Sequence, residues 1–322
     1  MAEAGAFPRQ GRPASAPPVQ ARRPAQRATP ADRSVGLMTA DDAGSIDLAG
    51  RRVPRLGYGT MRLTGPRIFG PPADRDEAVR VVRRAVELGV RVIDTAWYYG
   101  PGVASPIVAD ALHPYPDDVV LVTKLGGARR DDASWYSALT DRELREGCEQ
   151  DLRQLRLEQV PLTHLRWMQG SGVSFEDALA TMLALQAEGK IGAIGLSNVD
   201  VAQLDVALGE TPVATVSNAY SVVDRTHEAL VGRCEQAGIP FLPFFPLGAS
   251  PVRSGAGVSR SDGVSSVAAR HGVSPIQVAL AWLLQRSPVL VPIPGTSSVA
   301  HLEENLAAAQ LRLDDDDLAA LA

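Results

Sequence analysis

The chain has 322 residues and a formal net charge of −5, and 45% of its residues are hydrophobic. This length allows one large barrel or two ordinary domains, while the mildly acidic balance argues against the basic face that nucleic-acid binding needs. No apolar run approaches the length of a membrane span, so we expect a cytoplasmic globular protein. The two cysteines, Cys148 and Cys234, fall in predicted helices, and neither a disulfide nor a metal site is expected.

The beginning of the chain differs in composition from the rest. Residues 1–37 contain six arginines and almost no large apolar side chain, so they cannot build a core. We predict a disordered extension over 1–40 and a single folded domain over 41–322. A secretory signal would need a continuous apolar stretch, which this segment lacks, whereas an Arg-rich transit peptide remains an alternative.

From residue 45 onward, short apolar runs alternate with longer stretches of helical period, which is typical of parallel α/β folds. After a hairpin at 45–53, the predicted strands are 56–60, 90–93, 119–123, 161–167, 191–196, 212–217, 239–245 and 289–293. The predicted helices are 74–88, 105–112, 141–157, 175–188, 201–208, 226–237 and 274–286, with a last helix starting at the acidic run 314–317. Eight strand–helix units predict a closed (β/α)8 TIM barrel with an N-terminal hairpin and C-terminal helices.

An open doubly wound sheet is the alternative architecture. A dinucleotide-binding sheet of that kind should show Gly-x-Gly-x-x-Gly directly after its first strand. Gly57 and Gly59 lie at the end of the first predicted strand, but no third glycine follows at the right spacing. We interpret the two glycines as close packing at the mouth of a barrel.

Polar side chains follow two successive apolar strands. Asp94 and Tyr99 come directly after the strand at 90–93, and Lys124 directly follows the strand at 119–123. The carboxyl ends of parallel strands meet at one end of the fold, where active sites lie, so these three side chains are candidates for one site. An ammonium favours a phenolate and a carboxylate holds the ammonium, which suits general acid catalysis on a carbonyl.

Five segments, in order and spacing, resemble the aldo-keto reductase superfamily. They are GYGTM at 57–61, DTAWYYG at 94–100, TK at 123–124, GKIGAIGLSN at 189–198 and IPGT at 293–296. The resemblance implies a nicotinamide-dependent reductase that acts on a small-molecule carbonyl, an aldehyde or ketone, with NADPH as cofactor and NADH possible. It implies that Tyr99 is the proton donor, that Lys124 lowers the pKa of Tyr99, and that Asp94 pairs with Lys124.

One position departs from the family pattern. Arg166 stands where a histidine usually closes the fourth strand, and His164 lies two residues earlier on the same face. Arg166 cannot lose its proton, so it can anchor or polarise an oxygen but cannot act as the acid. We therefore expect Tyr99 to remain the donor, Arg166 to hold a carbonyl or carboxylate, and His164 to be a packed interior residue.

The resemblance also implies a set of cofactor contacts. Ser197 and Asn198 would bind the nicotinamide carboxamide, Tyr220 would stack on the nicotinamide ring, and the loop 245–250 would cover the pyrophosphate. The full set of implied cofactor residues is Gly59, Thr60, Met61, Ser197, Asn198, Ser217, Tyr220, Pro246, Leu247, Ser250, Thr296, Ser297, Glu304 and Asn305. Trp135 and Tyr136, in a predicted loop after the third strand, are candidates for the substrate pocket.

Two other functions remain open at this point. A barrel aldolase could use Lys124 to form a Schiff base with a carbonyl substrate. Alternatively, because of Arg166, the chain could be a nicotinamide-binding barrel whose reductase activity is weak or lost.

Overall fold

Apolar runs of the predicted strands form a parallel sheet in which each strand lies beside the next one along the chain. In the computed structural model the described residues are Met1, 39–248 and 257–322. The strands in spatial order are β3 (Tyr58–Gly59), β4 (Val92–Asp94), β5 (Val120–Arg129), β7 (Val160–Arg166), β8 (Ile191–Ser197) and β9 (Val216–Ser217). Every neighbouring pair on this path is parallel, as predicted.

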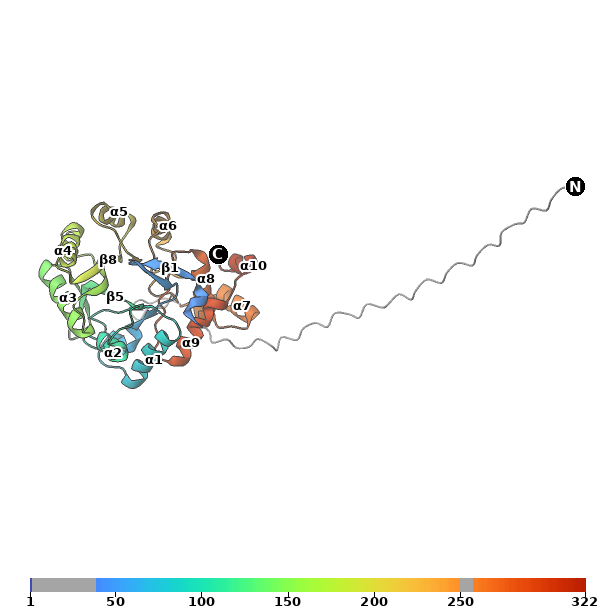
Figure 1. The fold of residues 1–322 in the computed structure, drawn as a ribbon, viewed down its shortest axis with the longest axis horizontal. Helices are drawn as coiled ribbons and strands as arrows, with labels where there is room; N and C mark the ends of the chain where they lie inside the picture. Colours follow the sequence, from blue (N-terminus) through green and yellow to red (C-terminus); the bar gives the residue numbers. More distant parts are fainter. Residues whose placement is uncertain (2–38, 249–256) are drawn as a thin grey trace. The chain divides into compact units, whose positions relative to one another are not determined.

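Helices connect the strands and surround the sheet (Figure 1). They are α1 (Arg75–Glu87), α2 (Ala104–Leu112), α3 (Asp141–Leu155), α4 (Phe175–Ala187), α5 (Val201–Glu210), α6 (Glu228–Ala237), α7 (Asp262–His271), α8 (Pro275–Arg286), α9 (Val299–Ala307) and α10 (Asp315–Ala320). Capping boxes at Thr140, Asp200 and Ser274 start α3, α5 and α8, because each side chain accepts a bond from an otherwise unpaired backbone N–H. Helix α7 was not predicted from the sequence.

The two ends of the described domain carry small elements. The predicted hairpin is present as β1 (Ser45–Leu48) and β2 (Arg51–Pro54). The unit Leu37–Ala322 has its first described element at the 3-10 helix η1 (Ala40–Ala43), whose Ala40 is fully buried. Apart from Met1 and residues 39–40, the predicted extension lies outside the described residues, and so does Ser250.

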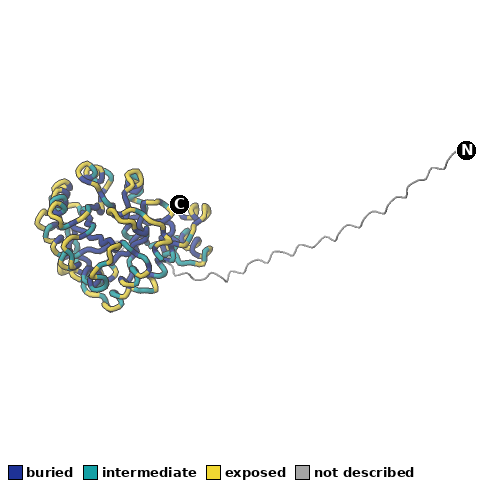
Figure 2. Tube along the Cα trace, viewed as in Figure 1, coloured by how far each residue is buried: buried dark blue, intermediate teal, exposed yellow. Residues whose placement is uncertain are grey.

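The interior of the curled sheet is filled by branched aliphatic side chains. Val92, Val120, Val122 and Leu162 form this inner cluster, with Leu48 of the hairpin packed against it. A second layer of apolar side chains lies between the sheet and the helices. The chain is accordingly buried at the centre and exposed on the outer faces of the helices (Figure 2).

Two predicted strands are not regular strands in the structure. The segments predicted as 239–245 and 289–293 are extended but joined to neighbours only by isolated bridges, Val216 to Phe241, Ala219 to Phe244 and Phe241 to Leu290. The first segment contains Pro240 and Pro243 and the second contains Pro292, and proline has no N–H to donate to a ladder. The predicted strand 212–217 is reduced to the two residues of β9.

A hairpin replaces the loop that was predicted around Trp135. Strand β5 continues beyond the sheet as far as Arg129 and pairs antiparallel with β6 (Trp135–Ala138). The guanidinium of Arg129 stacks on the Trp135 ring, 4.3 Å from its centroid, and donates to three backbone carbonyls. This hairpin places Trp135 beside Arg166, which closes β7.

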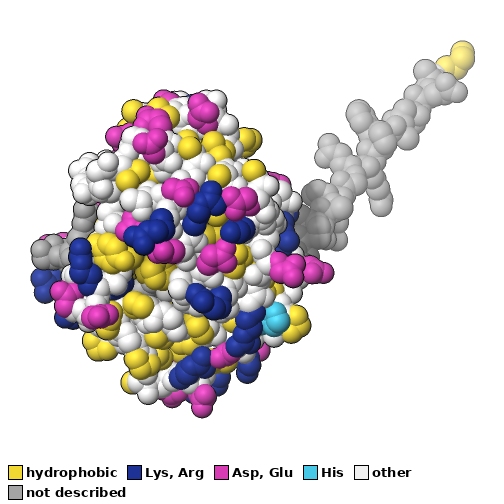
Figure 3. Space-filling model, turned by 90° about the vertical axis from the view of Figure 1, so that its left-hand side faces the viewer, with side chains coloured by type: hydrophobic (Ala, Val, Ile, Leu, Met, Phe, Trp, Pro, Cys, Tyr) yellow, Lys and Arg dark blue, Asp and Glu magenta, His cyan; other side chains and the backbone are white. Residues whose placement is uncertain are grey.

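The surface mixes the two signs of charge. Lys and Arg lie interspersed with Asp and Glu on the face shown in Figure 3. None of the described helices has an apolar stretch long enough to cross a bilayer.

Candidate active site

A pocket opens where β3, β4, β7 and β8 end, beside the middle of β5. Its empty volume is about 840 Å³, and its lining is Gly59, Met61, Arg62, Asp94, Tyr99, Lys124, Arg166, Ser197, Phe244, Phe245, Pro246, Leu247, Ile293, Pro294 and Gly295. The parallel register brings these strand ends to one level, since Asp94 pairs with Val122 and Lys124 with His164. The structure therefore gathers all four residues predicted to be catalytic.

An ion pair forms the floor of the pocket. The Lys124 ammonium lies 2.6 Å from both carboxylate oxygens of Asp94 and 3.2 Å from the backbone oxygen of Thr95. The two side chains are only 3% and 5% exposed. Burial raises the pKa of Asp94, and the ammonium opposes that rise. Because both side chains are shielded from water and their charged atoms are in hydrogen-bond contact, the pair is held rigidly and carries almost no net charge.

The structure distinguishes the two adjacent tyrosines. Tyr99 lines the pocket, with the Lys124 ammonium 5.2 Å from its ring centroid. Tyr98 instead packs edge-on against Trp97, Tyr99 and Trp135, and its buried hydroxyl points to the Arg166 guanidinium without a hydrogen bond of normal geometry. Burial raises the pKa of Tyr98 to about 12. Only Tyr99 can present its hydroxyl to a ligand.

The charges around Tyr99 differ from the expectation that Lys124 lowers its pKa. Burial raises the pKa of Tyr99, the Asp94 carboxylate raises it further, and Arg166 is the cation that lowers it. The reason is that Asp94 neutralises Lys124 at short range. Tyr99 therefore carries its proton at neutral pH, and Arg166 is the group that would stabilise the phenolate left after proton transfer.

His164 is an interior residue, as expected. It is fully buried below the pocket, and its Nε2 lies 2.6 Å from the Thr215 hydroxyl. Burial lowers the pKa of His164 well below its usual range, and the Lys124 ammonium adds to this effect. The imidazole occupies the space beside Gly195, where a Cβ would collide with it.

Some of the predicted cofactor residues line the pocket and others do not. Those in the lining are Gly59, Met61, Ser197, Pro246 and Leu247. Gly59 is needed there, because a Cβ on it would stand 2.8 Å from the Ile293 backbone oxygen. The hydroxyl of Ser197 is buried with no hydrogen-bond partner, so it can donate to or accept from a bound molecule.

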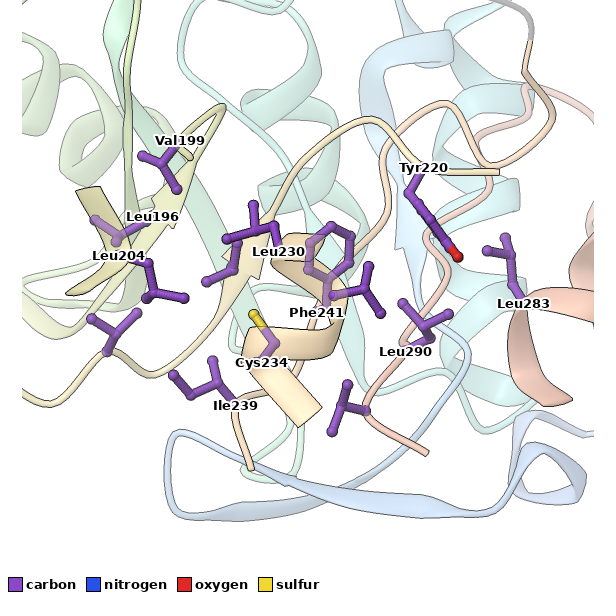
Figure 4. Close-up of a cluster of buried hydrophobic side chains, with 14 of the residues drawn as sticks. Leu196, Val199, Leu204, Tyr220, Leu230, Cys234, Ile239, Phe241, Leu283 and Leu290 are labelled. Carbon is purple, nitrogen blue, oxygen red and sulfur yellow. The ribbon is translucent and has the colours of Figure 1, made fainter. Parts of the chain in front are cut away.

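Tyr220 is the clearest departure from the predicted set. It is 1% exposed, its hydroxyl donates to Glu228, and its ring packs against Phe241 and Trp282 within the apolar core (Figure 4). Its side chain is used for packing and does not line the pocket. Besides Tyr99, the aromatic residues that line the pocket are Phe244 and Phe245.

Seven other predicted cofactor residues lie outside the lining: Thr60, Asn198, Ser217, Thr296, Ser297, Glu304 and Asn305. Ser217 donates to the Leu242 carbonyl and Asn198 to the Trp167 carbonyl, so both stabilise backbone near the pocket. Thr296 accepts from the Ser298 N–H at the start of α9. Thr60 and Asn305 are buried, and Ser297 is exposed.

Two lining residues, Phe244 and Arg62, were missed by the sequence analysis. Phe244 directly precedes the predicted loop 245–250, and an aromatic next to Pro246-Leu247-Gly248 was the available signal. Arg62 follows the 57–61 motif, is exposed, and stands at the rim beside Gly295. Arg62 thus supplies a cation at the rim of the pocket.

Comparison with known proteins agrees with this geometry. The model of the Aldo/keto reductase family matches residues 55–322. The chain belongs to the aldo/keto reductase family. It is 43% identical over 285 residues to a pyridoxine 4-dehydrogenase of Escherichia coli, covering 87% of this chain and 97% of that protein. The predicted family is confirmed, and this family member is an oxidoreductase.

Other family members are similar over most of their length. A methylglyoxal reductase of E. coli is 31% identical over 279 residues, covering 84% of this chain and 90% of that protein. The structure of an aldo/keto reductase from Klebsiella pneumoniae in complex with NADP and acetate matches with a TM-score of 0.70 and 29% identity, covering 86% of this chain and 93% of that one. The similarity thus includes the whole sheet and the pocket.

Proposed function

We propose that this protein is an NADPH-dependent carbonyl reductase that reduces an aldehyde or ketone to the alcohol, with Tyr99 as the proton donor. The observation that carries the proposal is the position of Tyr99, which faces the pocket beside the buried Asp94–Lys124 pair and within the field of Arg166. A protonated phenol next to an uncompensated cation is suited to protonate a carbonyl oxygen.

The architecture proposed with this function is the complete (β/α)8 barrel. Backbone hydrogen bonds continue around the ring past β9: Leu242 donates to Val216, Phe241 donates to Val289, and Val291 donates to Phe241. Gly57 and Gly59 of the first strand region then donate to Pro292 and Pro294. These bonds join the last extended segment to the first, which supports closure despite the prolines.

NADPH fits the residues that are present. The unpaired Ser197 hydroxyl can bind the nicotinamide carboxamide, and the flat faces of Phe244 and Phe245 can contact the nicotinamide ring. Arg62 can pair with a cofactor phosphate, because its guanidinium has no carboxylate partner among the described residues. The small residues Gly59 and Gly295 allow close approach of backbone at the rim.

The reaction needs one proton from the protein. NADPH held in this pocket would supply a hydride for the carbonyl carbon, and Tyr99 would give its proton to the carbonyl oxygen, so that the C=O π bond is replaced by C–H and O–H bonds while the nicotinamide is oxidised. Arg166 stabilises the resulting phenolate until solvent returns a proton. Lys124 fixes Asp94 beneath the ring and keeps the pocket floor dry. Both Asp94 oxygens lie 2.6 Å from the Lys124 nitrogen, and this contact favours an ion-pair role for Lys124 over a Schiff base with the substrate.

The substrate proposed first is pyridoxal, with pyridoxine as the product. The 43% identity to a pyridoxine 4-dehydrogenase over nearly its whole length supports this choice. Methylglyoxal is the second substrate to examine, because of the more distant methylglyoxal reductase.

The test is oxidation of NADPH followed by its absorbance, with pyridoxal, methylglyoxal and a panel of simple aldehydes and ketones, and with NADH in parallel. We expect turnover with pyridoxal and a higher kcat/KM with NADPH than with NADH. Tight NADPH binding without turnover of any carbonyl would instead favour a cofactor-binding protein that has lost its chemistry.

A further inference from the structure

Among the described residues that line the pocket, Arg166 is the cation near Tyr99 that has no carboxylate within ion-pair distance. The ionisable groups that line the pocket are Arg62, Asp94, Lys124 and Arg166, besides Tyr99 itself. Asp94 and Lys124 neutralise each other, and Arg62 stands at the rim beside Gly295. Within residues 39–248 and 257–322, no carboxylate lies within ion-pair distance of Arg166. The reacting end of the pocket therefore carries an excess positive charge.

The protein holds this charge in place by packing. The Arg166 guanidinium lies 5.1 Å from the ring centroid of Trp135, whose far side is covered by Arg129 at 4.3 Å. Tyr98 packs edge-on against the same indole. Stacking fixes the position of the guanidinium, while Arg166 is only half-buried and faces the pocket. A negatively charged ligand oxygen in the pocket can therefore reach it and supply the anion that the protein does not place there.

From this geometry we infer that Arg166 selects carbonyl substrates that carry a negatively charged oxygen on the atom next to the carbonyl-bearing carbon. This inference deepens the proposed function and rests on it. A guanidinium presents two parallel N–H groups and binds two neighbouring oxygens together. With the carbonyl oxygen at the Tyr99 hydroxyl, an adjacent oxyanion falls within the field of Arg166. An aromatic aldehyde with an ortho-phenolate has this arrangement, and so does pyridoxal, whose 3-oxygen is ionised near neutrality.

The test compares pyridoxal with 3-deoxypyridoxal, which lacks only this oxygen. In the unmodified protein, kcat/KM should be about 100-fold higher for pyridoxal, the size expected of a charge-assisted hydrogen bond. In Arg166→Gln the ratio of kcat/KM for pyridoxal to kcat/KM for 3-deoxypyridoxal should fall to about 3-fold or less. Arg166→Lys should give an intermediate ratio, because lysine keeps the charge but lacks the two parallel N–H groups of the guanidinium. The matched control is Arg130→Gln. Arg130 lies on the same hairpin and stacks on Tyr136, outside the pocket, so its substitution should leave the ratio unchanged.

A binding measurement separates this inference from the proposed reaction. Calorimetric titration of the NADPH-loaded protein with pyridoxine or 3-deoxypyridoxine involves no turnover, because an alcohol and a reduced cofactor cannot react. Pyridoxine should bind about 100-fold more tightly, and Arg166→Gln should remove the difference. If discrimination appears without turnover, the proposed reductase activity is wrong and the oxyanion site stands. Equal kcat/KM for both aldehydes, or a ratio that survives in Arg166→Gln, overturns the inference and leaves the reductase intact.

Discussion

Asp151 offers a strong test of the energetic description of the fold. This residue lies on the inner side of α3, is 0% exposed, and has no hydrogen bond of normal geometry to either carboxylate oxygen. Burial raises the pKa of Asp151 from 3.8 to about 8, although the Thr123 hydroxyl and the backbone N–H of Trp97 act in the opposite direction. The change to test is Asp151→Asn, which keeps the shape and cannot titrate.

The size of the effect on the free energy of unfolding follows from the difference between the pKa of Asp151 in the folded protein and its pKa in the unfolded chain. Between pH 4 and pH 8 the folded protein holds the Asp151 proton while the unfolded chain has lost it. Stability that is fully present below pH 4 is therefore lost as the pH rises towards the folded pKa of about 8. At 1.36 kcal/mol per unit, a difference of about four units amounts to about 5 kcal/mol. Domains of this kind have a total stability of only about 5–15 kcal/mol, so the effect should be large.

The assay is urea unfolding followed by tryptophan fluorescence at intervals from pH 4.5 to pH 8.5. Relative to the unmodified protein, Asp151→Asn should gain about 4 to 5 kcal/mol of unfolding free energy across this range. Asp131→Asn, at an exposed carboxylate, is the control and should give a curve parallel to that of the unmodified protein. Parallel curves for Asp151→Asn as well would refute the reasoning, since they would mean that folding does not change the proton affinity of this group.

Two further predictions concern the pocket floor and the interior beneath it. Asp94→Asn leaves the Lys124 ammonium buried without an anion, and should lower the free energy of unfolding in urea by about 3–5 kcal/mol. The double variant with Lys124→Met should recover much of this loss. A double variant as unstable as Asp94→Asn alone would contradict the ion-pair account. Gly195→Ala places a Cβ against His164 and should destabilise by about 1–3 kcal/mol. Gly209→Ala, in open space on α5, should instead be neutral or stabilising, and equal effects of the two changes would argue against a tightly packed interior.

Regular elements were predictable where one period dominates the sequence. Helices such as α1 and α3 were placed within one or two residues, because their apolar stripes are clear and each has a capping side chain at its start. The predicted strands 239–245 and 289–293 have the composition of buried strands, but their hydrogen bonding depends on which positions are proline. The β5–β6 hairpin was missed because its second strand, Trp135–Ala138, is too short to show a period.

The reacting centre was more predictable than the cofactor contacts. Asp94, Tyr99 and Lys124 follow the predicted strands 90–93 and 119–123, and the parallel register of β4 and β5 brings these positions together, although β5 continues beyond Lys124. Tyr220 was assigned to the nicotinamide because of its distance from the end of a strand, but a turn directs its ring into the core. Asp151 stands in the polar sequence Glu149-Gln150-Asp151 and was not recognised as buried, since its burial depends on how α3 lies on the sheet.

The most direct measurement of the central claim is the single-turnover rate of NADPH oxidation by Tyr99→Phe at saturating pyridoxal, beside the control Tyr98→Phe. Loss of the proton donor should lower the rate by about 10² to 10⁴-fold while NADPH still binds, because general acid catalysis contributes an effect of this size. Tyr98→Phe removes a buried hydroxyl that does not line the pocket, and should lower the rate far less than Tyr99→Phe. A Tyr99→Phe protein that oxidises NADPH as fast as the unmodified one would contradict the account.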